Sequence, residues 1–204
     1  MIKIVDYGLG NILAFYNLYK SMNIDIEVAK TSDKLKSADK IILPGVGSFD
    51  HAMSKLNQSG MREVLDELVL EKKVPVLGIC VGMQMMLRKS EEGVENGLGW
   101  IQSDVIKFDQ NFNGVENKTP HMGWNSIDPK SDSPLLKNLT SQSKFYFLHS
   151  YFCDIKKSEH ILASTNYQKE FTSILQFNNI YGIQCHPEKS HTSGVNLLTN
   201  FSNI

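Results

Sequence analysis

Cys80 stands in a sequence pattern that can supply a nucleophile. The segment Gly78-Ile79-Cys80-Val81-Gly82 follows an unbroken apolar run, Val74–Ile79, and precedes a helical pattern over Met83–Leu87. Glycines on both sides of the cysteine permit a sharp strand-to-helix turn that raises its side chain above the sheet. The helix N-terminus behind the sulfur favours the thiolate. A lone cysteine is more often buried and inert, so this motif alone leaves both interpretations open.

A cysteine nucleophile needs a base, and the base needs a group that orients it. A strand predicted over Ile180–Gln184 ends just before His186-Pro187-Glu188. Residues two apart in an extended chain point to the same side, and the proline ring restrains the backbone between them. The Glu188 carboxylate can then hold one imidazole nitrogen while the other faces a thiol. The sequence therefore predicts a catalytic triad of Cys80, His186 and Glu188.

Two loops give weaker signals. Pro44-Gly45-Val46-Gly47 follows a predicted strand and can turn backbone N–H groups toward an oxyanion, although most such loops are simple turns. Tyr7-Gly8-Leu9-Gly10-Asn11 begins like a dinucleotide fingerprint, but Leu13 stands where the third glycine is required. We therefore expect no nucleotide cofactor.

The remaining sequence must build the sheet that positions these residues. The first half alternates predicted strands with amphipathic helical patterns, and this alternation is typical of a parallel sheet covered on both faces. The strands are Ile2–Val5, Ile24–Ala29, Lys40–Leu43 and Val74–Ile79, and the helices are Asn11–Met22, His51–Leu56 and Met61–Leu70. The second half is strand-like, with a closing helix over Ser193–Phe201. Its strands are Gly99–Phe108, Gly123–Ile127, Lys144–Phe152, His160–Thr165, Phe171–Phe177 and Ile180–Gln184, with a hairpin turn at Asn178-Asn179.

These elements predict a single α/β domain over residues 1–204. We expect a three-layer, flavodoxin-like architecture with an open, mostly parallel sheet and an antiparallel extension. Ligands of such sheets collect outside the carboxyl ends of the strands, where both catalytic motifs stand.

Composition narrows the class of protein. The chain has 204 residues, of which 41% are hydrophobic, and its 21 basic and 22 acidic residues give a net charge of −1. This balance provides no basic field for nucleic acid. The least polar long stretch, Val74–Leu87, is too short to span a bilayer, and the N-terminus shows no signal-peptide layout. Three cysteines without metal or disulfide spacing predict a reduced, cytoplasmic protein without a metal site, with Cys153 and Cys185 in the core.

Taken together, the motifs resemble the class I (triad) glutamine amidotransferases. Gly78 to Gln84 and His186-Pro187-Glu188 carry this resemblance. Four segments further resemble the branch of glutaminase subunits of imidazole glycerol phosphate synthase: Asp6–Asn11, Leu43–Phe49, Pro120-His121-Met122-Gly123-Trp124-Asn125 and His186–Ser190. The resemblance runs from about Ile2 to Phe201. Val81 and Cys185 depart from the family pattern, but both exchange one apolar residue for another.

The resemblance implies a function for the chain. It would hydrolyse L-glutamine through a Cys80 thioester, without a cofactor, and pass ammonia to a (β/α)8-barrel cyclase subunit in a heterodimer. The residues that match glutamine-binding positions are Gly45, Gly47, Val81, Gln84, Glu92, His149, Ser150 and Tyr151. The residues that match partner-facing positions are Asn11, Met122, Trp124, Asn125, Tyr146 and Lys189. A buried, purely structural Trp124 is the alternative at that position, and Phe147 is predicted to be core.

Two other functions fit the same motifs. A paralogous subunit would supply ammonia to a sugar amidotransferase that forms amidino groups on polysaccharide precursors. A stand-alone cysteine hydrolase or peptidase would need neither a partner nor the residues Gln84 and Glu92. The polar loop Asp109–Lys118 carries no predicted function.

Overall fold

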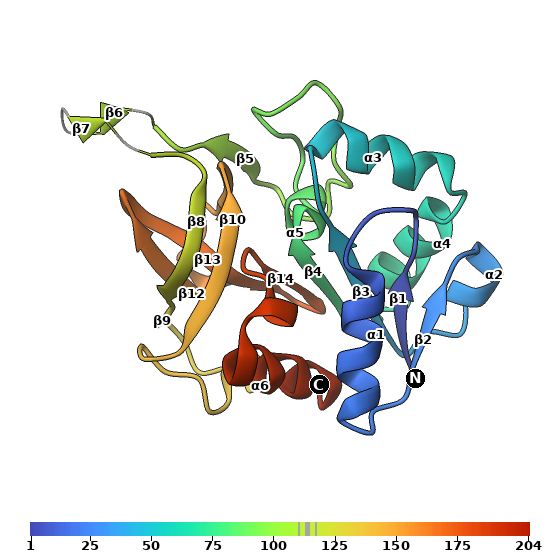
Figure 1. The fold of residues 1–204 in the computed structure, drawn as a ribbon. Helices are drawn as coiled ribbons and strands as arrows, with labels where there is room; N and C mark the ends of the chain where they lie inside the picture. Colours follow the sequence, from blue (N-terminus) through green and yellow to red (C-terminus); the bar gives the residue numbers. More distant parts are fainter. Residues whose placement is uncertain (110, 113–114, 117) are drawn as a thin grey trace.

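The computed structural model describes residues 1–109, 111–112, 115–116 and 118–204 (Figure 1). The first half contains four strands, five α-helices and one π-helix: β1 (Ile2–Val5), α1 (Ile12–Ser21), β2 (Ile26–Ala29), α2 (Ser32–Leu35), β3 (Lys40–Gly45), α3 (Phe49–Gln58), α4 (Arg62–Asp66), the π-helix η1 (Glu67–Glu71), β4 (Val76–Cys80) and α5 (Val81–Met85).

The second half is mostly strand. Its elements are β5 (Asp104–Lys107), β6 (Asn111–Phe112), β7 (Val115–Glu116), β8 (His121–Ser126), β9 (Asp128–Pro129), η2 (Pro134–Leu136), β10 (Lys144–His149), β11 (Tyr151–Asp154), η3 (Ser158–His160), β12 (Ile161–Tyr167), β13 (Lys169–Phe177), β14 (Ile180–Ile183), η4 (Pro187–Lys189) and α6 (His191–Ser202).

One sheet combines strands from both halves of the chain. Its order is β2-β1-β3-β4-β14-β13-β12-β9, parallel from β2 to β14 and antiparallel from β14 onward. This confirms the predicted mostly parallel sheet with an antiparallel extension. The strand that precedes His186, β14, pairs directly with β4, which ends in Cys80. The sheet order thus places the two motifs side by side although about 100 residues separate them in sequence.

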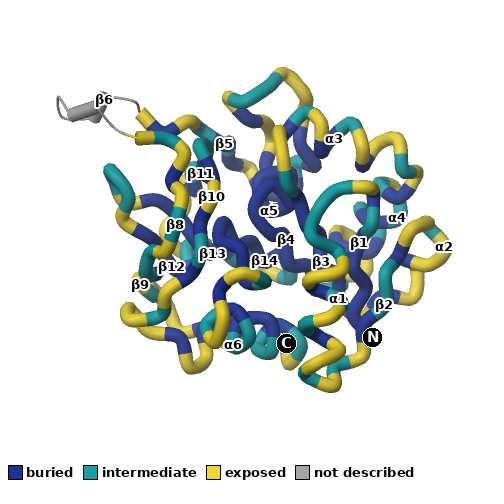
Figure 2. Tube along the Cα trace, in the orientation of Figure 1, coloured by how far each residue is buried: buried dark blue, intermediate teal, exposed yellow. Residues whose placement is uncertain are grey.

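The central strands are covered on both faces. Every residue of β1, β4 and β14 is buried, and these strands are dark blue in Figure 2. Helices α1 and α6 are joined by a hydrogen bond from the Tyr19 hydroxyl to the Leu198 carbonyl, and α5 packs against β3, β4 and α3. Strands buried on both faces read as continuous apolar runs, which explains the unbroken hydrophobicity before Cys80.

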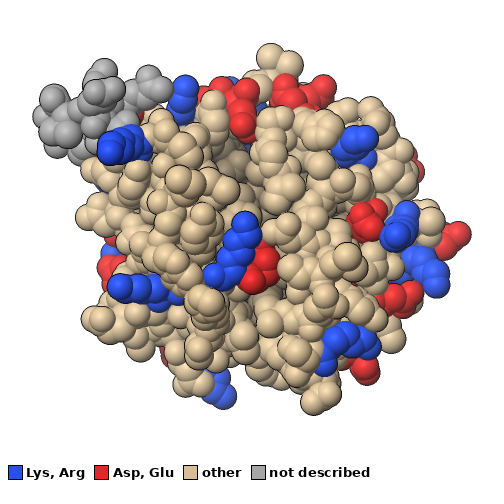
Figure 3. Space-filling model, in the orientation of Figure 1, with Lys and Arg blue, Asp and Glu red and all other residues tan. Residues whose placement is uncertain are grey.

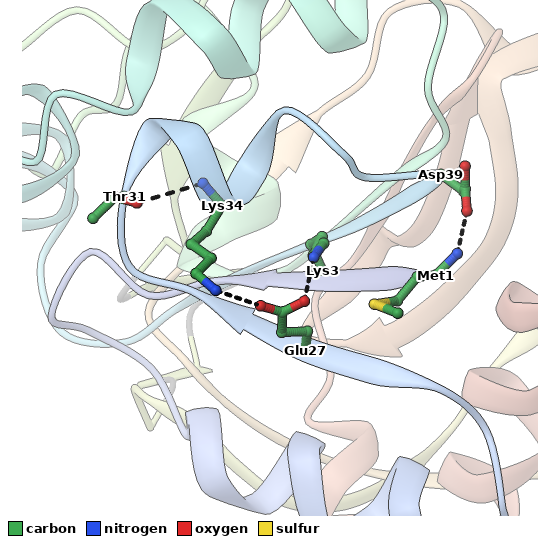
Figure 4. Close-up of polar contacts among 6 residues, drawn as sticks. All are labelled: Met1, Lys3, Glu27, Thr31, Lys34 and Asp39. Atoms are coloured by element: carbon green, nitrogen blue, oxygen red, sulfur yellow. Dashed lines mark hydrogen bonds and ion pairs between the residues drawn. The ribbon is translucent and has the colours of Figure 1, made fainter.

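The edge of the sheet at β2 is held by charged side chains (Figure 4). Lys3 is only 3% exposed, and its Nζ lies 2.5 Å from Glu27 Oε2 on the neighbouring strand. Lys34 approaches the other carboxylate oxygen of Glu27 at 3.4 Å, and the Thr31 hydroxyl accepts a hydrogen bond from the Lys34 backbone N–H. The buried ammonium therefore has a paired charge, as burial of a charge requires.

Several predicted element boundaries differ from the structure. The predicted strand Lys144–Phe152 is divided at Ser150 into β10 and β11, which pair with different partners. Only Asp104–Lys107 of the predicted strand Gly99–Phe108 is extended. Helix α5 begins at Val81 rather than Met83. The hairpin at Asn178-Asn179 is confirmed, with Asn178 at φ 53°, a conformation that asparagine tolerates well.

Basic and acidic side chains are interspersed on the face shown in Figure 3, without an extended field of one sign. Within the described part of the chain, no helix is both long and apolar enough to cross a membrane.

Candidate active site

Cys80 occupies a strained turn between β4 and α5. Its backbone has φ 55° and ψ −114°, a positive-φ conformation that residues with a side chain rarely adopt. A Cβ on Gly78 would lie 2.6 Å from the Met86 side chain, and one on Gly82 would lie 2.0 Å from the Leu43 carbonyl oxygen. Both flanking glycines are therefore needed for the helix to approach the sheet so closely.

His186 reaches the sulfur from the neighbouring strand. Its backbone N–H donates to the Tyr146 carbonyl at 2.8 Å, which ties the residue to β10. Its imidazole hydrogen-bonds the Cys80 side chain, and its Nδ1 lies 2.9 Å from Glu188 Oε1. The structure thus brings the three residues of the predicted triad into one line of contacts.

The electrostatics of this line favour a charged imidazole. Burial by itself lowers the pKa of His186, but hydrogen bonds to Cys80 and Glu188 outweigh it and raise the pKa above its ordinary value. Burial raises the pKa of Glu188, yet the bonds from His186 and Asn11 reverse this and leave the pKa lowered. A proton on His186 is therefore stabilised between the sulfur and the carboxylate.

A cavity of about 470 Å³ opens onto the sulfur. Its lining includes the sulfur-bearing Cys80, His186 and most of the residues predicted to bind glutamine: Gly47, Val81, Gln84, Glu92, His149, Ser150 and Tyr151. Gly45 lies behind the cavity, paired with Cys80 across β3 and β4, where a Cβ would come within 2.3 Å of the Gly82 nitrogen. Gly47 has φ 86° and is exposed.

Known proteins resemble the chain along its whole length. The family model "Glutamine amidotransferase class-I" matches residues 3–203. Proteins named "Imidazole glycerol phosphate synthase subunit HisH" from Bdellovibrio bacteriovorus and Leptospira interrogans are 57% and 48% identical, with full coverage of both chains.

The chain belongs to the class-I glutamine amidotransferases, within the HisH family. A solved structure titled "Crystal structure of glutamine amidotransferase" has the same fold, with a TM-score of 0.76, 15% identity and coverage of 100% of this chain and 99% of that chain. The resemblance stated from the motifs is therefore confirmed at the level of family and fold.

The side chain of Glu92 in this amidotransferase lies at the N-terminus of helix α3. Its Oε2 accepts a hydrogen bond from the backbone N–H of Phe49, the first residue of α3, at 2.8 Å. Asp50, the next residue, accepts from the backbone N–H groups of Val94 and Glu95. These reciprocal contacts anchor the loop that carries Glu92 and hold its carboxylate at the wall of the cavity.

Gln184 is a site residue that the sequence analysis did not single out. Its Nε2 lies 3.7 Å from Cys80 Sγ, and its Oε1 accepts a hydrogen bond from Gln84 Nε2 at 3.0 Å. The period of a strand could have indicated it, because residues two apart face the same side and Gln184 precedes His186 by two. The residue between them, Cys185, points the other way and is fully buried, as predicted.

The residues predicted to face a partner lie around Tyr146. The Trp124 ring lies 6.2 Å from the Tyr146 ring, and Lys189 Nζ lies 5.6 Å from that ring's centre. Met122 is 65% exposed and Trp124 is 48% exposed, so the alternative of a buried Trp124 is wrong. Asn125 is half-buried. Asn11 differs from this group, because its side-chain amide points at Glu188.

Cys153 and Phe147 are buried, as predicted. Within the described residues, no group of three or more His, Cys, Asp and Glu side chains could hold a metal ion. Of the polar loop Asp109–Lys118, residues 110, 113–114 and 117 lie outside the described part of the chain.

Proposed function

We propose that this chain is the glutaminase subunit of an imidazole glycerol phosphate synthase, which hydrolyses L-glutamine to glutamate and ammonia. The observation that carries the proposal is the line of Cys80, His186 and Glu188 at one end of a cavity. A volume of about 470 Å³ suits a small polar substrate. The family membership supports the same reaction.

Formation of the thioester begins with transfer of the thiol proton from Cys80 to His186. The sulfur attacks the carboxamide carbon of glutamine and the carbonyl electrons move onto oxygen. As this tetrahedral intermediate collapses, His186 gives its proton to the departing nitrogen and ammonia leaves. Glu188 keeps the imidazole oriented and stabilises its positive charge, as the acidic member of such triads does.

Hydrolysis of the thioester uses the same groups in reverse. His186 takes a proton from water as the water oxygen attacks the thioester carbon. When this second tetrahedral intermediate collapses, the carbon–sulfur bond breaks, His186 returns the proton to the departing sulfur, and glutamate is released. In both steps the oxyanion needs hydrogen-bond donors. The Val81 backbone N–H at the start of α5 and the Gly45–Gly47 loop beside it are the candidates, and one such donor is typically worth about 3–4 kcal/mol of barrier.

The binding of glutamine would use the rest of the cavity. Glu92 supplies a carboxylate for the α-ammonium group, and the segment His149–Tyr151 and Gln84 line the same cavity. The ammonia would pass to a (β/α)8-barrel cyclase that produces imidazole glycerol phosphate and aminoimidazole carboxamide ribotide. The exposed Met122 and Trp124 beside Tyr146 are side chains of the types that concentrate binding energy at protein interfaces.

The proposal is tested by co-expressing the chain with the cyclase subunit from the same cell. We expect glutamine-dependent product formation from the formimino substrate, and its loss in Cys80→Ala with binding of the cyclase unchanged. Cys153→Ala is the matched control, because it removes a buried sulfur that does not line the cavity and should keep activity. Full turnover by Cys80→Ala would refute the proposal, and activity only with a sugar-modifying partner would assign the chain to the paralogous pathway.

A further inference from the structure

Two buried histidines beside the cavity take no part in the proposed chemical steps. His121 begins β8 and is 3% exposed, and His149 ends β10 and is 6% exposed. His121 Nδ1 lies 3.0 Å from His149 Nε2. The His121 ring is stacked between two aromatic rings, with centroid distances of 4.8 Å to Phe147 and 4.0 Å to Tyr167.

Backbone groups at both ends fix the direction of the hydrogen bonds through this pair. His149 Nδ1 lies 2.8 Å from the Tyr151 carbonyl, which can only accept, so Nδ1 carries the proton and Nε2 accepts from His121. At the other end, Asn125 Oδ1 accepts from the Ser126 N–H and Asn125 Nδ2 donates to the Asn166 carbonyl. The same amide therefore donates to His121 Nε2 at 3.2 Å.

Both rings are thus neutral in this arrangement. A proton added to either ring would turn two donors toward each other at buried side chains, which carries the cost of an unmade buried hydrogen bond. Burial acts in the same direction, lowering the pKa of His121 to about 4 and that of His149 to about 3. The pair therefore keeps one orientation throughout the neutral pH range.

The pair is connected to the nucleophile by two amide side chains. The Tyr151 carbonyl accepts a second hydrogen bond from Gln84 Nε2 at 3.1 Å. The same nitrogen donates to Gln184 Oε1 at 3.0 Å, and Gln184 Nε2 lies 3.7 Å from Cys80 Sγ. Each group in this series thus has the number of donors or acceptors that it needs: the Tyr151 carbonyl accepts two hydrogen bonds, and the two N–H groups of Gln84 Nε2 donate one each to Tyr151 and Gln184.

We propose that His121 and His149 are positioning residues for the nucleophile: they fix the Tyr151 carbonyl, which through Gln84 aims the Gln184 amide at the Cys80 sulfur. A donor aimed at sulfur stabilises the thiolate over the thiol. The inference rests on the proposed function, in which Cys80 is the nucleophile, and it adds the residues that position the donor for the Cys80 thiolate. Neither histidine touches the sulfur.

The test is the pH profile of Cys80 alkylation by iodoacetamide in the full-length chain, followed by mass spectrometry. His121→Phe keeps a stacked ring and removes both nitrogens. We expect its alkylation at neutral pH to be about 3- to 10-fold slower than in the wild-type chain, with the profile displaced toward higher pH. Tyr167→Leu is the matched control, because it removes a stacking partner of His121 and leaves the hydrogen bonds between His121 and Cys80 in place; the one hydrogen bond that it removes, from the Tyr167 hydroxyl to the Lys118 carbonyl, lies outside this series.

The titratable groups that interact electrostatically with Cys80 are His186, Tyr7, Cys153 and Cys185. Glu92, His149, Tyr151 and Lys189 line the same cavity, and none of these residues is changed by the two variants. A shift in His121→Phe that is absent in Tyr167→Leu therefore reports the hydrogen-bonded series rather than a general loss of packing.

A second variant approaches the series from its other end. Gln184→Met removes the donor at the sulfur, so we expect a slowing at least as large as that of His121→Phe. The double variant should be no slower than Gln184→Met alone, because both changes act through one donor. Additive effects, or wild-type alkylation in His121→Phe, would overturn the inference while leaving the proposed function standing. Failure of the proposed function gives a different result: wild-type Cys80 would react no faster than Cys153.

Discussion

Asn11 Nδ2 donates a hydrogen bond to Glu188 Oε1 at 2.7 Å, on the same oxygen that faces His186 Nδ1 at 2.9 Å. The contact joins the residue before α1 to the acidic member of the predicted triad across 177 positions of sequence. Asn11 was predicted to face a partner, and in the structure its amide is directed at Glu188 of the predicted triad. Glu188 Oε1 thus accepts hydrogen bonds from two side chains, which fixes the orientation of Glu188 and of the imidazole beside it.

We predict that Asn11→Ala lowers kcat for glutamine hydrolysis by about 10-fold, because a hydrogen bond to a charged group contributes on the order of 1.5–3 kcal/mol. The measurement is glutamate release at saturating concentrations of glutamine and of the cyclase subunit. Asn17→Ala, an exposed change on the same helix, is the control. If Asn11 served only the interface, the dissociation constant for the cyclase would rise while kcat at saturation stayed at the wild-type value.

A glutamine-derived electrophile, such as a diazo-ketone analogue of glutamine, should label Cys80 and spare the other two cysteines. Burial raises the pKa of the Cys153 and Cys185 thiols far above the neutral range, whereas Cys80 lines the cavity and hydrogen-bonds an imidazole. Peptide mapping by mass spectrometry gives the labelled positions, with the unfolded chain as the control in which all three thiols are accessible. Equal labelling of the three in the folded chain would contradict an activated thiolate.

The free energy of unfolding should fall as the pH is lowered from about 6.5 to about 5, because His121 and His149 are buried without protons. Their pKa values are about 4 and about 3, so the unfolded chain binds more protons than the folded one in this window. The slope is at most about 1.4 kcal/mol per pH unit for each histidine.

His186 has the opposite effect on how the free energy of unfolding depends on pH. Its pKa is raised, so its contribution is complete below about pH 6.5 and is lost as the pH rises through its folded-state pKa. Urea unfolding at a series of pH values measures these slopes. His121→Phe should give a shallower dependence below pH 6.5, and the exposed change His51→Ala serves as the comparison. An unchanged slope in His121→Phe would show that this ring takes up a proton in the folded state.

Gly82→Ala tests the close approach of α5 to β3. A Cβ at this position would lie 2.0 Å from the Leu43 carbonyl oxygen, so the helix must move away and the chain should lose about 3 kcal/mol of stability or more. Gly60→Ala is the matched control: Gly60 has φ 70° and open space around it, so only backbone strain of about 1 kcal/mol is expected. Thermal unfolding measures the loss of stability in each variant. Equal losses would mean that the turn between β4 and α5 tolerates the extra methyl group.

The sequence by itself determined the local parts of the site. The glycines around Cys80 and the spacing of His186 and Glu188 are local patterns, and the period of a strand predicted correctly that Cys185 faces the core. The alternation of strands and helices predicted the parallel part of the sheet, because a strand buried on both faces is apolar throughout. Element ends were less well predicted: the two polar residues His149 and Ser150 are too short an interruption to mark the break between β10 and β11, which depends on their different partners.

Only the tertiary structure decided which distant side chains meet. The pairing of β14 with β4 brings Gln184 to the sulfur, the return of the chain after β14 brings Glu188 to Asn11, and the pairing of β8 with β10 opposes His121 to His149. A hydrogen bond depends on two atoms being within about 3 Å in a defined orientation. The composition and the hydrophobic periodicity of a sequence describe each partner of such a bond separately. The distance between the partners is set by the order and register of the strands, which only the tertiary structure shows.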